Sequence, residues 1–375
     1  MAKETHGAII VGAGFAGLYL LHRLRGLGIS AICLEAADDV GGTWYWNRYP
    51  GARCDVESMQ YSFSFSEELQ QEWRWSERFA AQPEILAYAR HIAERFDLRR
   101  DIHFETRVTD AAWDDAAGLW RIATSRGESF TARYFFMATG CLSAARLPDI
   151  PGIADFKGRQ FHTGYWPHHK VDFTGRRVAV IGTGSSAIQS IPVIAEQAAQ
   201  LTVFQRTPNF SIPSRNRPMD DEYEQGWKRD YASLRKQARM MRTGILYGLS
   251  ETPAMSVSAE ERRAEYEKRW ATGGTAFMGS FRDLLLDQAA NDTAAEFVRG
   301  KIREIVKDPA TAEKLCPRNH PIGTKRICVD TNYYETYNRP NVSLIDINAA
   351  PITRITPSGR SEERRVGKEC LRLCR

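Results

Sequence analysis

Two glycine-rich turns have the residue types and the spacing that bind nucleotide phosphates. The first, Gly12-Ala13-Gly14-Phe15-Ala16-Gly17, follows a strand-like apolar run at residues 8–11 and precedes a helical apolar pattern at residues 18–24. In such a unit the first glycine permits a tight turn, the second lets a pyrophosphate approach the backbone, and the third lets the helix pack on the strand. The next predicted strand, residues 29–34, ends at Glu35, whose carboxylate would accept hydrogen bonds from ribose hydroxyls and repel a 2′-phosphate. This unit predicts a site for FAD or NAD and not for NADP.

A second unit of the same kind begins at a predicted strand, residues 177–181. Its turn reads Gly182-Thr183-Gly184-Ser185-Ser186-Ala187, and a predicted helix follows at residues 188–199. The next predicted strand, residues 201–205, ends in Arg206-Thr207 where the first unit has its glutamate. A cation and a hydroxyl suit a 2′-phosphate, so the second nucleotide is predicted to be NADPH.

Together the two units predict an FAD and NADPH pair and flavin-dependent redox chemistry, because NADPH donates hydride and a flavin accepts it. Flavin disulfide reductases of this build carry a redox-active cysteine pair, but the seven cysteines here are scattered and form no C-x-x-C motif. The same scatter argues against a disulfide scaffold and a zinc ribbon. No carboxylate or cysteine has metal-ligand spacing to His168-His169, so we expect no metal site. We expect the reduced flavin to react with dioxygen.

Composition excludes several other classes of protein. The 375 residues, 43% apolar and 26% charged, are typical of a globular chain with two or three domains. The net charge of +5 is concentrated in residues 360–375, which hold six Arg or Lys against three Glu, so no nucleic-acid partner is expected. No run approaches the roughly 18 to 20 apolar residues of a spanning helix, and the N-terminus has no signal-peptide core. We expect a cytoplasmic monomer that does not contact a membrane.

A third motif links the sequence to a known family. Residues 156–167 read FKGRQFHTGYWP, which matches the F-x-G-x-x-x-H-x-x-x-W-[P/D] fingerprint of type I Baeyer–Villiger monooxygenases. The chain resembles this family, and its phenylacetone- and cyclohexanone-oxidising members in particular, to about Pro357. The resemblance implies an NADPH- and dioxygen-dependent enzyme that inserts one oxygen atom beside a ketone carbonyl, through a flavin peroxide, to give an ester or lactone. The alternative is an N- or S-oxygenating flavin monooxygenase, a group that usually carries another aromatic residue in place of Trp166.

The resemblance also implies roles for individual residues. The Arg326 guanidinium would lower the pKa of the peroxide and stabilise the oxyanion of the addition intermediate, with Asp55 as its ion-pair partner. Lys325 would bind the 2′-phosphate, and His162 would lie at a hinge and not act as a general base. The implied cofactor contacts are Gly12, Gly14, Phe15, Ala16, Gly17, Glu35, Thr43, Trp44, Tyr45, Trp46, Arg53, Cys54, Asp55, Tyr61 and Val108 in the FAD half, and Gly182, Thr183, Gly184, Ser185, Ser186, Ala187, Gln189, Arg206, Thr207 and Lys325 in the NADP half.

The expected fold class is α/β, with two dinucleotide-binding, Rossmann-like domains for FAD and NADP and a helical insertion in the NADP domain. We predict the N-terminal part of an FAD domain at residues 1–145, an NADP domain at residues 146–218 and 320–359, and the insertion at residues 219–319. Residues 134–140 are predicted to form a buried strand that ends in an A-T-G turn.

Local signals refine the helical insertion. Ser258 and Glu261 form a predicted capping box at the start of one helix. Asp308-Pro309 is predicted to begin another, because proline is well suited to the first helical position.

The last residues follow a different pattern. Residues 360–375 offer no apolar period, and residues 360–370 resemble the translated read-through of a sequencing-library adapter. We therefore expect a non-native, disordered tail on a truncated chain whose FAD domain is incomplete. An inactive fragment that only binds NADP(H) is the further alternative.

Overall fold

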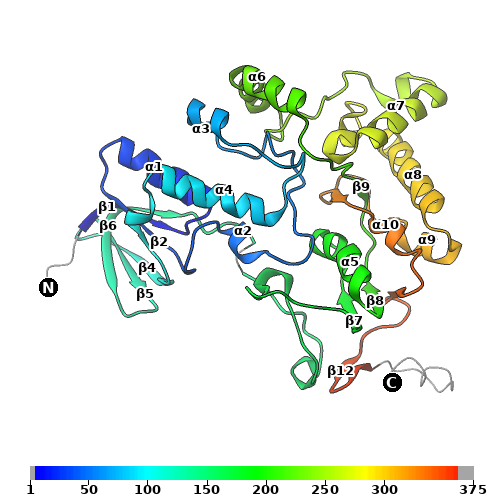
Figure 1. Ribbon diagram of the computed structural model, residues 1–375, viewed down its shortest axis with the longest axis horizontal. Helices are drawn as coiled ribbons and strands as arrows, with labels where there is room; N and C mark the ends of the chain where they lie inside the picture. The colour runs from blue at the N-terminus through cyan, green and yellow to red at the C-terminus, as the bar shows by residue number, and fades with distance from the viewer. Residues whose placement is uncertain (1–4, 143, 362–375) are drawn as a thin grey trace. The chain divides into compact units, whose positions relative to one another are not determined.

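The computed structural model describes residues 5–142 and 144–361 and divides them between two compact units (Figure 1). The first unit contains the described residues up to Arg48 together with Gln82–Leu147 and Phe161–His168; the second contains Tyr49–Ala81, Pro148–Gln160 and the described residues from His169 onward. Each unit holds one of the two glycine-rich turns. The fingerprint at residues 156–167 is shared, because the chain passes from the second unit to the first at Phe161.

The first unit is built on a six-stranded sheet in the order β3-β2-β1-β6-β5-β4. Its strands are β1 (Thr5–Val11), β2 (Ala31–Leu34), β3 (Ile102–His103), β4 (Val108–Asp114), β5 (Leu119–Thr124) and β6 (Ser129–Met137). The strands β3, β2, β1 and β6 run parallel, and β5 and β4 extend the sheet antiparallel. Ile9 of β1 lies between Ile32 of β2 and Phe135 of β6, in a core that includes Leu34 and Ile122.

Helices of the first unit pack on this sheet and on one another. The helices α1 (Phe15–Gly26) and α4 (Gln82–Arg95) contact each other, and α1 also contacts β1 and β2. α1 buries Leu18, Leu21 and Leu24, which share one helical face. The short helix α2 (Thr43–Trp46) packs on α4, and 3-10 turns lie at Arg99–Asp101 and Thr163–Tyr165.

The second unit holds a parallel three-stranded sheet in the order β11-β8-β7 and a separate parallel pair, β9 with β10. Its strands are β7 (Arg177–Ile181), β8 (Gln200–Gln205), β9 (Ser211–Pro213), β10 (Cys328–Asp330) and β11 (Val342–Asp346). Helix α5 (Ser185–Gln197) joins β7 to β8 and also contacts β10 and α10 (Tyr333–Thr336). The predicted α/β fold with two Rossmann-like units is thus confirmed.

A helical layer separates β9 from β10 in the sequence. It contains α6 (Asp221–Met240), α7 (Ala259–Thr272), α8 (Gln288–Ile305) and α9 (Pro309–Leu315), with 3-10 turns at Ala254–Ser256 and Gly274–Gly279. The predicted capping box at Ser258 and the Asp308-Pro309 helix start are both present. Aromatic rings hold the layer together: Tyr266 and Trp270 of α7 are buried and contact Phe277 and Phe297. Among the described residues, no helix is both long and apolar enough to cross a membrane.

Residues 49–81 differ from the predicted organisation. The sequence places them in the first domain, but in the structure they belong to the second unit, with helix α3 (Glu67–Glu72). Backbone pairing across more than a hundred residues of sequence explains the difference: Glu77 forms a β-bridge with Pro218, and Arg78 N donates to Arg217 O over 3.0 Å. The local sequence pattern of residues 49–81 does not indicate these long-range hydrogen bonds.

Strand β6 and the chain end also depart from expectation. Tyr134 and Met137 of the strand predicted to be buried are 44% and 76% exposed. Pairing with β1 and β5 satisfies the backbone of β6, but a side chain is buried only where another layer covers that face, and the described residues leave these two open. The predicted disordered tail begins inside an antiparallel hairpin, since β13 (Gly359–Ser361) pairs with β12 (Arg354–Thr356). Residues 362–375 lie outside the described residues.

Candidate functional site

Two glycines of the first turn, Gly12 and Gly17, occupy positions that no other residue would fit. Gly12 has a φ of +102°, and a Cβ there would lie 2.7 Å from Ala138 O. A Cβ on Gly17 would lie 1.9 Å from Gly12 O, so only glycine lets α1 pack this closely on the turn. Gly14 is the N-cap of α1 and provides no side-chain cap. The glycine spacing in the sequence therefore corresponds to a tight backbone turn at the start of α1, which we call the cradle.

The two helices that follow the glycine-rich turns start differently from the four helices of the helical layer. α1 and α5 begin after Gly14 and Gly184, without a side-chain cap and without an acidic residue in the first turn. By contrast α6, α7, α8 and α9 are each capped by a side-chain oxygen, from Asp220, Ser258, Asp287 and Asp308. An uncapped helix start presents backbone N–H groups and a partial positive charge to an anion. Both turns therefore fit the phosphates of a dinucleotide.

Glu35, directly after β2, is fixed in place by backbone hydrogen bonds. Its carboxylate is buried and accepts hydrogen bonds from Ala13 N at 2.6 Å and Ala37 N at 2.8 Å. Because each carboxylate oxygen can accept a second hydrogen bond, both retain capacity for a hydroxyl donor. The same residue that ties the glycine-rich turn to β2 can thus contact a ribose.

The aromatic residues at 43–46 form α2, directly after two glycines with positive φ, Gly41 and Gly42. Trp44 and Tyr45 are buried, and Tyr45 donates a 2.5 Å hydrogen bond to Asp38 Oδ1. Burial and the neighbouring carboxylate raise the pKa of Tyr45 to about 12, so its hydroxyl stays protonated. Thr43, Trp46 and Val108 are only partly buried and can contact a ligand, whereas Ala16 faces solvent on α1.

The second glycine-rich turn is more open than the first. Gly182 has a φ of +104°, and neither Gly182 nor Gly184 has an atom within 4 Å of the position that a Cβ would take. Thr183 is buried and donates through Oγ1 to Thr207 O over 3.0 Å, which ties the turn to the end of β8. Arg206 is exposed at the same strand end and belongs to no ion pair among the described residues. A free guanidinium beside the turn suits a phosphate.

The second unit also brings Asp55 and Arg326 together. Arg326 Nη2 lies 3.2 Å from Asp55 Oδ2, with side-chain exposures of 72% and 6%. Burial raises the pKa of Asp55 to about 6 from 3.8, although Arg326, Ser185 and Gln189 oppose the rise. A long cationic side chain that reaches solvent is therefore tethered to a carboxylate that is not free to move.

A cavity of about 140 Å³ lies beside this ion pair. Its lining includes Asp55, Gln189, Glu196 and Asn332. Lys325, the neighbour of Arg326, is exposed. Burial lowers the pKa of His320, and the nearby charge of Lys325 lowers it further.

Three further predicted contacts, at Arg53, Cys54 and Tyr61, belong to the second unit. Arg53 makes an ion pair with Glu77 and donates to Phe79 O, so its guanidinium is directed into the protein. Cys54 is buried, and burial raises the pKa of its thiol to about 12, which makes it unreactive. Tyr61 belongs to the second unit, in a turn where its N–H donates to Glu57 O over 2.9 Å.

Comparison with known proteins places these features in a family. A sequence model of the family described as flavin-binding monooxygenase-like matches residues 5–252. The chain belongs to this family. Its relatives include a Baeyer–Villiger monooxygenase of Pseudooceanicola batsensis, 44% identical over 94% of this chain and 65% of the relative. The resemblance predicted from the fingerprint is thereby confirmed.

Other relatives show how widely the family's reactions vary. The 2-oxo-Δ3-4,5,5-trimethylcyclopentenylacetyl-CoA monooxygenase of Pseudomonas putida is 45% identical over 94% of this chain and 66% of the relative. The phenazine N-monooxygenase PhzNO1 of Lysobacter antibioticus is 44% identical over 95% of this chain and 66% of the relative. The chain thus spans just under two thirds of the length of these relatives.

Solved structures share the fold. An oxidised steroid monooxygenase bound to NADP superposes with a TM-score of 0.93 at 53% identity, covering 97% of this chain and 70% of that one. The complex of OTEMO with FAD and NADP has a TM-score of 0.93 at 44% identity and covers 96% of this chain and 68% of that one. The relationship extends over both units and not only over the glycine-rich turns.

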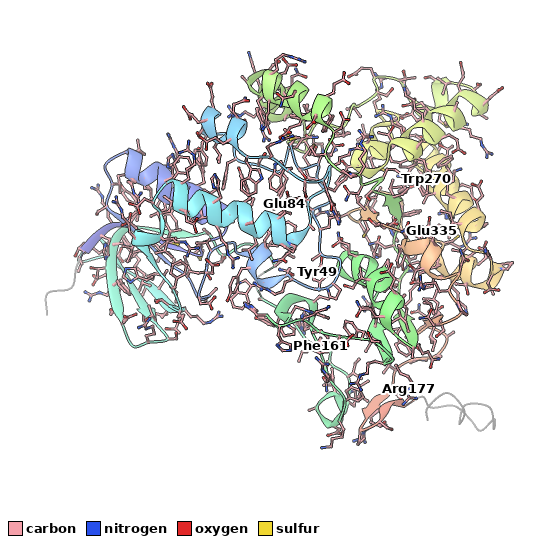
Figure 2. The ribbon with its side chains drawn as sticks, in the orientation of Figure 1. Tyr49, Glu84, Phe161, Arg177, Trp270 and Glu335 are labelled. Carbon is pink, nitrogen blue, oxygen red and sulfur yellow. The ribbon has the colours of Figure 1, made fainter. Side chains whose placement is uncertain are left out.

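Sequence reasoning missed two parts of this site. Tyr49 lies beside α5, where its hydroxyl donates to Gln189 Oε1 over 3.0 Å (Figure 2). Asp330 is a second buried carboxyl group whose pKa is raised by burial, to about 6. The sequence shows an acid shortly after Arg326. Only the fold shows that this acid is buried and that its charge acts on Asp55.

Proposed function

We propose that this chain carries the nucleotide-binding part of an NADPH- and dioxygen-dependent flavin monooxygenase that converts ketones to esters or lactones. In that reaction one oxygen atom enters between the carbonyl carbon and a neighbouring carbon, the other leaves as water, and NADPH supplies the electron pair. The observation that carries the proposal is the Asp55–Arg326 ion pair, which holds a permanent cation in the same unit as the open glycine-rich turn. The Baeyer–Villiger relative supports it.

The two cofactors have matching sites. FAD would be held by the Gly12–Gly17 turn, Glu35 and the aromatic residues of α2, and NADPH by the Gly182–Ala187 turn with Arg206 and Thr207. Lys325 is the further cation that we assign to the 2′-phosphate. When bound, the flavin takes hydride from NADPH and passes the electrons to dioxygen.

Arg326 has the properties that oxygen insertion requires of a protein cation. Its guanidinium stays charged at any working pH and presents a rigid set of N–H donors. Placed at the ketone oxygen, it would stabilise the negative charge that develops there as the carbonyl carbon is attacked. Asp55 restrains this cation through the 3.2 Å ion pair while leaving its outer face exposed.

The proposal is tested in a chimera. Residues 1–357 are joined to the remaining C-terminal third of the Pseudomonas putida relative, and the product is supplied with NADPH, a ketone panel and isotopically labelled dioxygen. We expect esters that carry one labelled oxygen atom, and we expect the Arg326→Ala chimera to form none. Labelled ester from the Arg326→Ala chimera at the unchanged rate would contradict the role of Arg326.

N-oxygenation is the second candidate, because the Lysobacter antibioticus relative is a phenazine N-monooxygenase of almost equal similarity. A chimera that oxygenates aromatic amines and leaves every ketone untouched would establish this function in place of ester formation. A third outcome is a fragment that binds only NADP(H). The chain itself would then bind NADP⁺ in a titration and purify without the absorbance band of flavin.

A further inference from the structure

Gln189 of α5 has every hydrogen-bonding position of its amide filled by protein. Its Oε1 accepts from Tyr49 Oη at 3.0 Å and from Arg53 N at 3.3 Å. Its Nε2 donates to Arg53 O at 3.0 Å and to Asp55 Oδ1 at 3.0 Å. An amide oxygen accepts two hydrogen bonds and an NH₂ group donates two, so no capacity is left for a ligand. The direct cofactor contact predicted for Gln189 therefore has no free amide group to make it.

The backbone of Arg53 fixes which way this amide points. Its N–H can only donate and its C=O can only accept, and Gln189 contacts both. If the amide were flipped, its NH₂ group would face the Arg53 N–H and its oxygen would face the Arg53 C=O. Neither pair can form a hydrogen bond, so the flipped orientation is excluded. Nε2 must then face Asp55, and Gln189 can only donate to it.

The loop that carries these groups is pressed against α5. Gly51 has a φ of +77°, and a Cβ there would lie 2.3 Å from Gln189 O. Any other residue at this position would force the loop away from the helix. The close approach holds Asp55 Oδ1 on Gln189, which leaves Oδ2 for Arg326.

We infer that Gln189 is a positioning residue for Asp55: its amide, locked in one orientation by Arg53, holds the carboxylate where it meets Arg326. The term positioning rests on the proposed function of the Asp55–Arg326 pair, whereas the hydrogen bonds do not. Gln189 presents an N–H group to Oδ1 of Asp55, and Arg326 presents one to Oδ2. Both favour the ionised form of Asp55, because a proton on either oxygen would face a donor.

The other titratable groups around Asp55 set the background for a test. Arg326 comes from the loop before β10 and Asp330 from β10 itself, and they act on Asp55 in opposite directions. Tyr49, Cys54 and Cys328 also face Asp55, and burial raises the pKa of each, so they stay neutral near pH 7. Asp330, whose pKa burial also raises to about 6, titrates in the same range, so its signal is followed beside that of Asp55.

The experiment compares two glutamines of one helix. Gln189→Leu removes the donor to Asp55, and Gln197→Leu removes a comparable bond, from Phe173 N to Gln197 Oε1. The titration of Asp55 is followed by NMR of carboxyl-labelled aspartate, with Asp55→Asn to assign the signal. We expect the pKa of Asp55 to rise by roughly one pH unit or more in Gln189→Leu, as expected for a lost bond to a charged group, and to stay unchanged in Gln197→Leu.

A second variant covers the case in which Gln189→Leu does not fold. Gln189→Glu keeps the length and the acceptor for Tyr49 and Arg53, but it places an oxygen against Asp55 Oδ1. It should raise the pKa of Asp55 at least as far. An unmoved pKa in both Gln189 variants, or an equal rise in Gln197→Leu, would overturn the inference. The titration needs neither cofactor nor substrate, so its failure is distinguishable from a failure of the proposed function.

Discussion

Replacing Asp55 by asparagine should stabilise the second unit at neutral pH, although it removes one partner of an ion pair. Burial holds the pKa of Asp55 at about 6, above its ordinary value of 3.8. Between about pH 4 and pH 6 the folded protein therefore binds more protons than the unfolded chain, and its free energy of unfolding falls as the pH rises. A pKa difference of about two units corresponds to about 3 kcal/mol of stability lost at neutral pH.

Asparagine avoids this cost because it resembles the protonated acid. Its carbonyl oxygen can still accept from Gln189 Nε2, which now donates to Asp55 Oδ1. Arg326 is 72% exposed and can turn into water, where the loss of such a partner costs at most about 1 kcal/mol. The variant should therefore unfold at higher urea concentration at neutral pH, by about 2 to 3 kcal/mol, and match the natural protein near pH 4.

The assay is urea unfolding of both proteins across this pH range, read from the fluorescence of the second unit's tryptophans. Asp172→Asn, also in the second unit, gives a control of opposite sign, because hydrogen bonds from the hydroxyl and the N–H of Thr174 lower the pKa of Asp172. That variant should lose a little stability at neutral pH. A stability difference for Asp55→Asn that does not change with pH, or a less stable variant near pH 7, would refute the reasoning.

Three further results are expected. Arg206→Ala in the chimera should lose at least tenfold of its preference for NADPH over NADH, measured as the ratio of the two kcat/KM values, because one charged contact contributes about 1.5 to 3 kcal/mol. Arg326→Ala should still allow NADPH to reduce the flavin in stopped flow but should abolish ester formation. Gly17→Ala should prevent flavin retention, because its Cβ would lie 1.9 Å from Gly12 O. The control Gly26→Ala, at the end of α1 where a Cβ meets no atom within 4 Å, should raise the free energy of unfolding by about 0.5 to 1 kcal/mol. Equal flavin content in these two glycine variants would contradict the role of the cradle.

The nucleotide turns could be predicted because their signal is local. Strand, turn and helix follow one another directly in the sequence, and the glycines at 12 and 17 correspond to backbone constraints that the structure contains. The acid or cation that ends the next strand is equally close in sequence. Such units need no knowledge of distant residues, and both were found with their elements in the right order.

Residues 49–81 could not be placed in the same way. Their contacts with Pro218 and Arg217 join segments that are far apart in sequence, and with Gln189 they form hydrogen bonds that span more than 130 residues. The pattern of these residues records neither partner. For the same reason the family resemblance implies a cofactor contact for Gln189, whereas in the structure its amide donates to Asp55.

The electrostatics of the described residues single out Asp55 among the acids with shifted pKa values. Most of these have a lowered pKa. Arginine partners lower it for Asp39, Glu296 and Glu313, and hydrogen bonds from serine or threonine lower it for Asp172, Glu261 and Asp308. Asp55 and Asp330 have theirs raised by burial. A buried acid of this kind costs stability and is expected where it does other work.

The partners of these two acids separate their roles. Asp330 accepts from Ser211 Oγ at 2.6 Å and from Tyr333 N at 3.1 Å, so it joins β9 to β10 and to the start of α10. Asp55 is instead bonded to an exposed cation in a loop and lies beside a cavity. Structural bonds within the protein account for the burial of Asp330, whereas the ion pair of Asp55 with a guanidinium that is 72% exposed stabilises little. Of the two costly carboxyl groups among the described residues, only Asp55 is ion-paired with a solvent-exposed cation, and this is the physical reason for proposing it, with Arg326, for the chemistry.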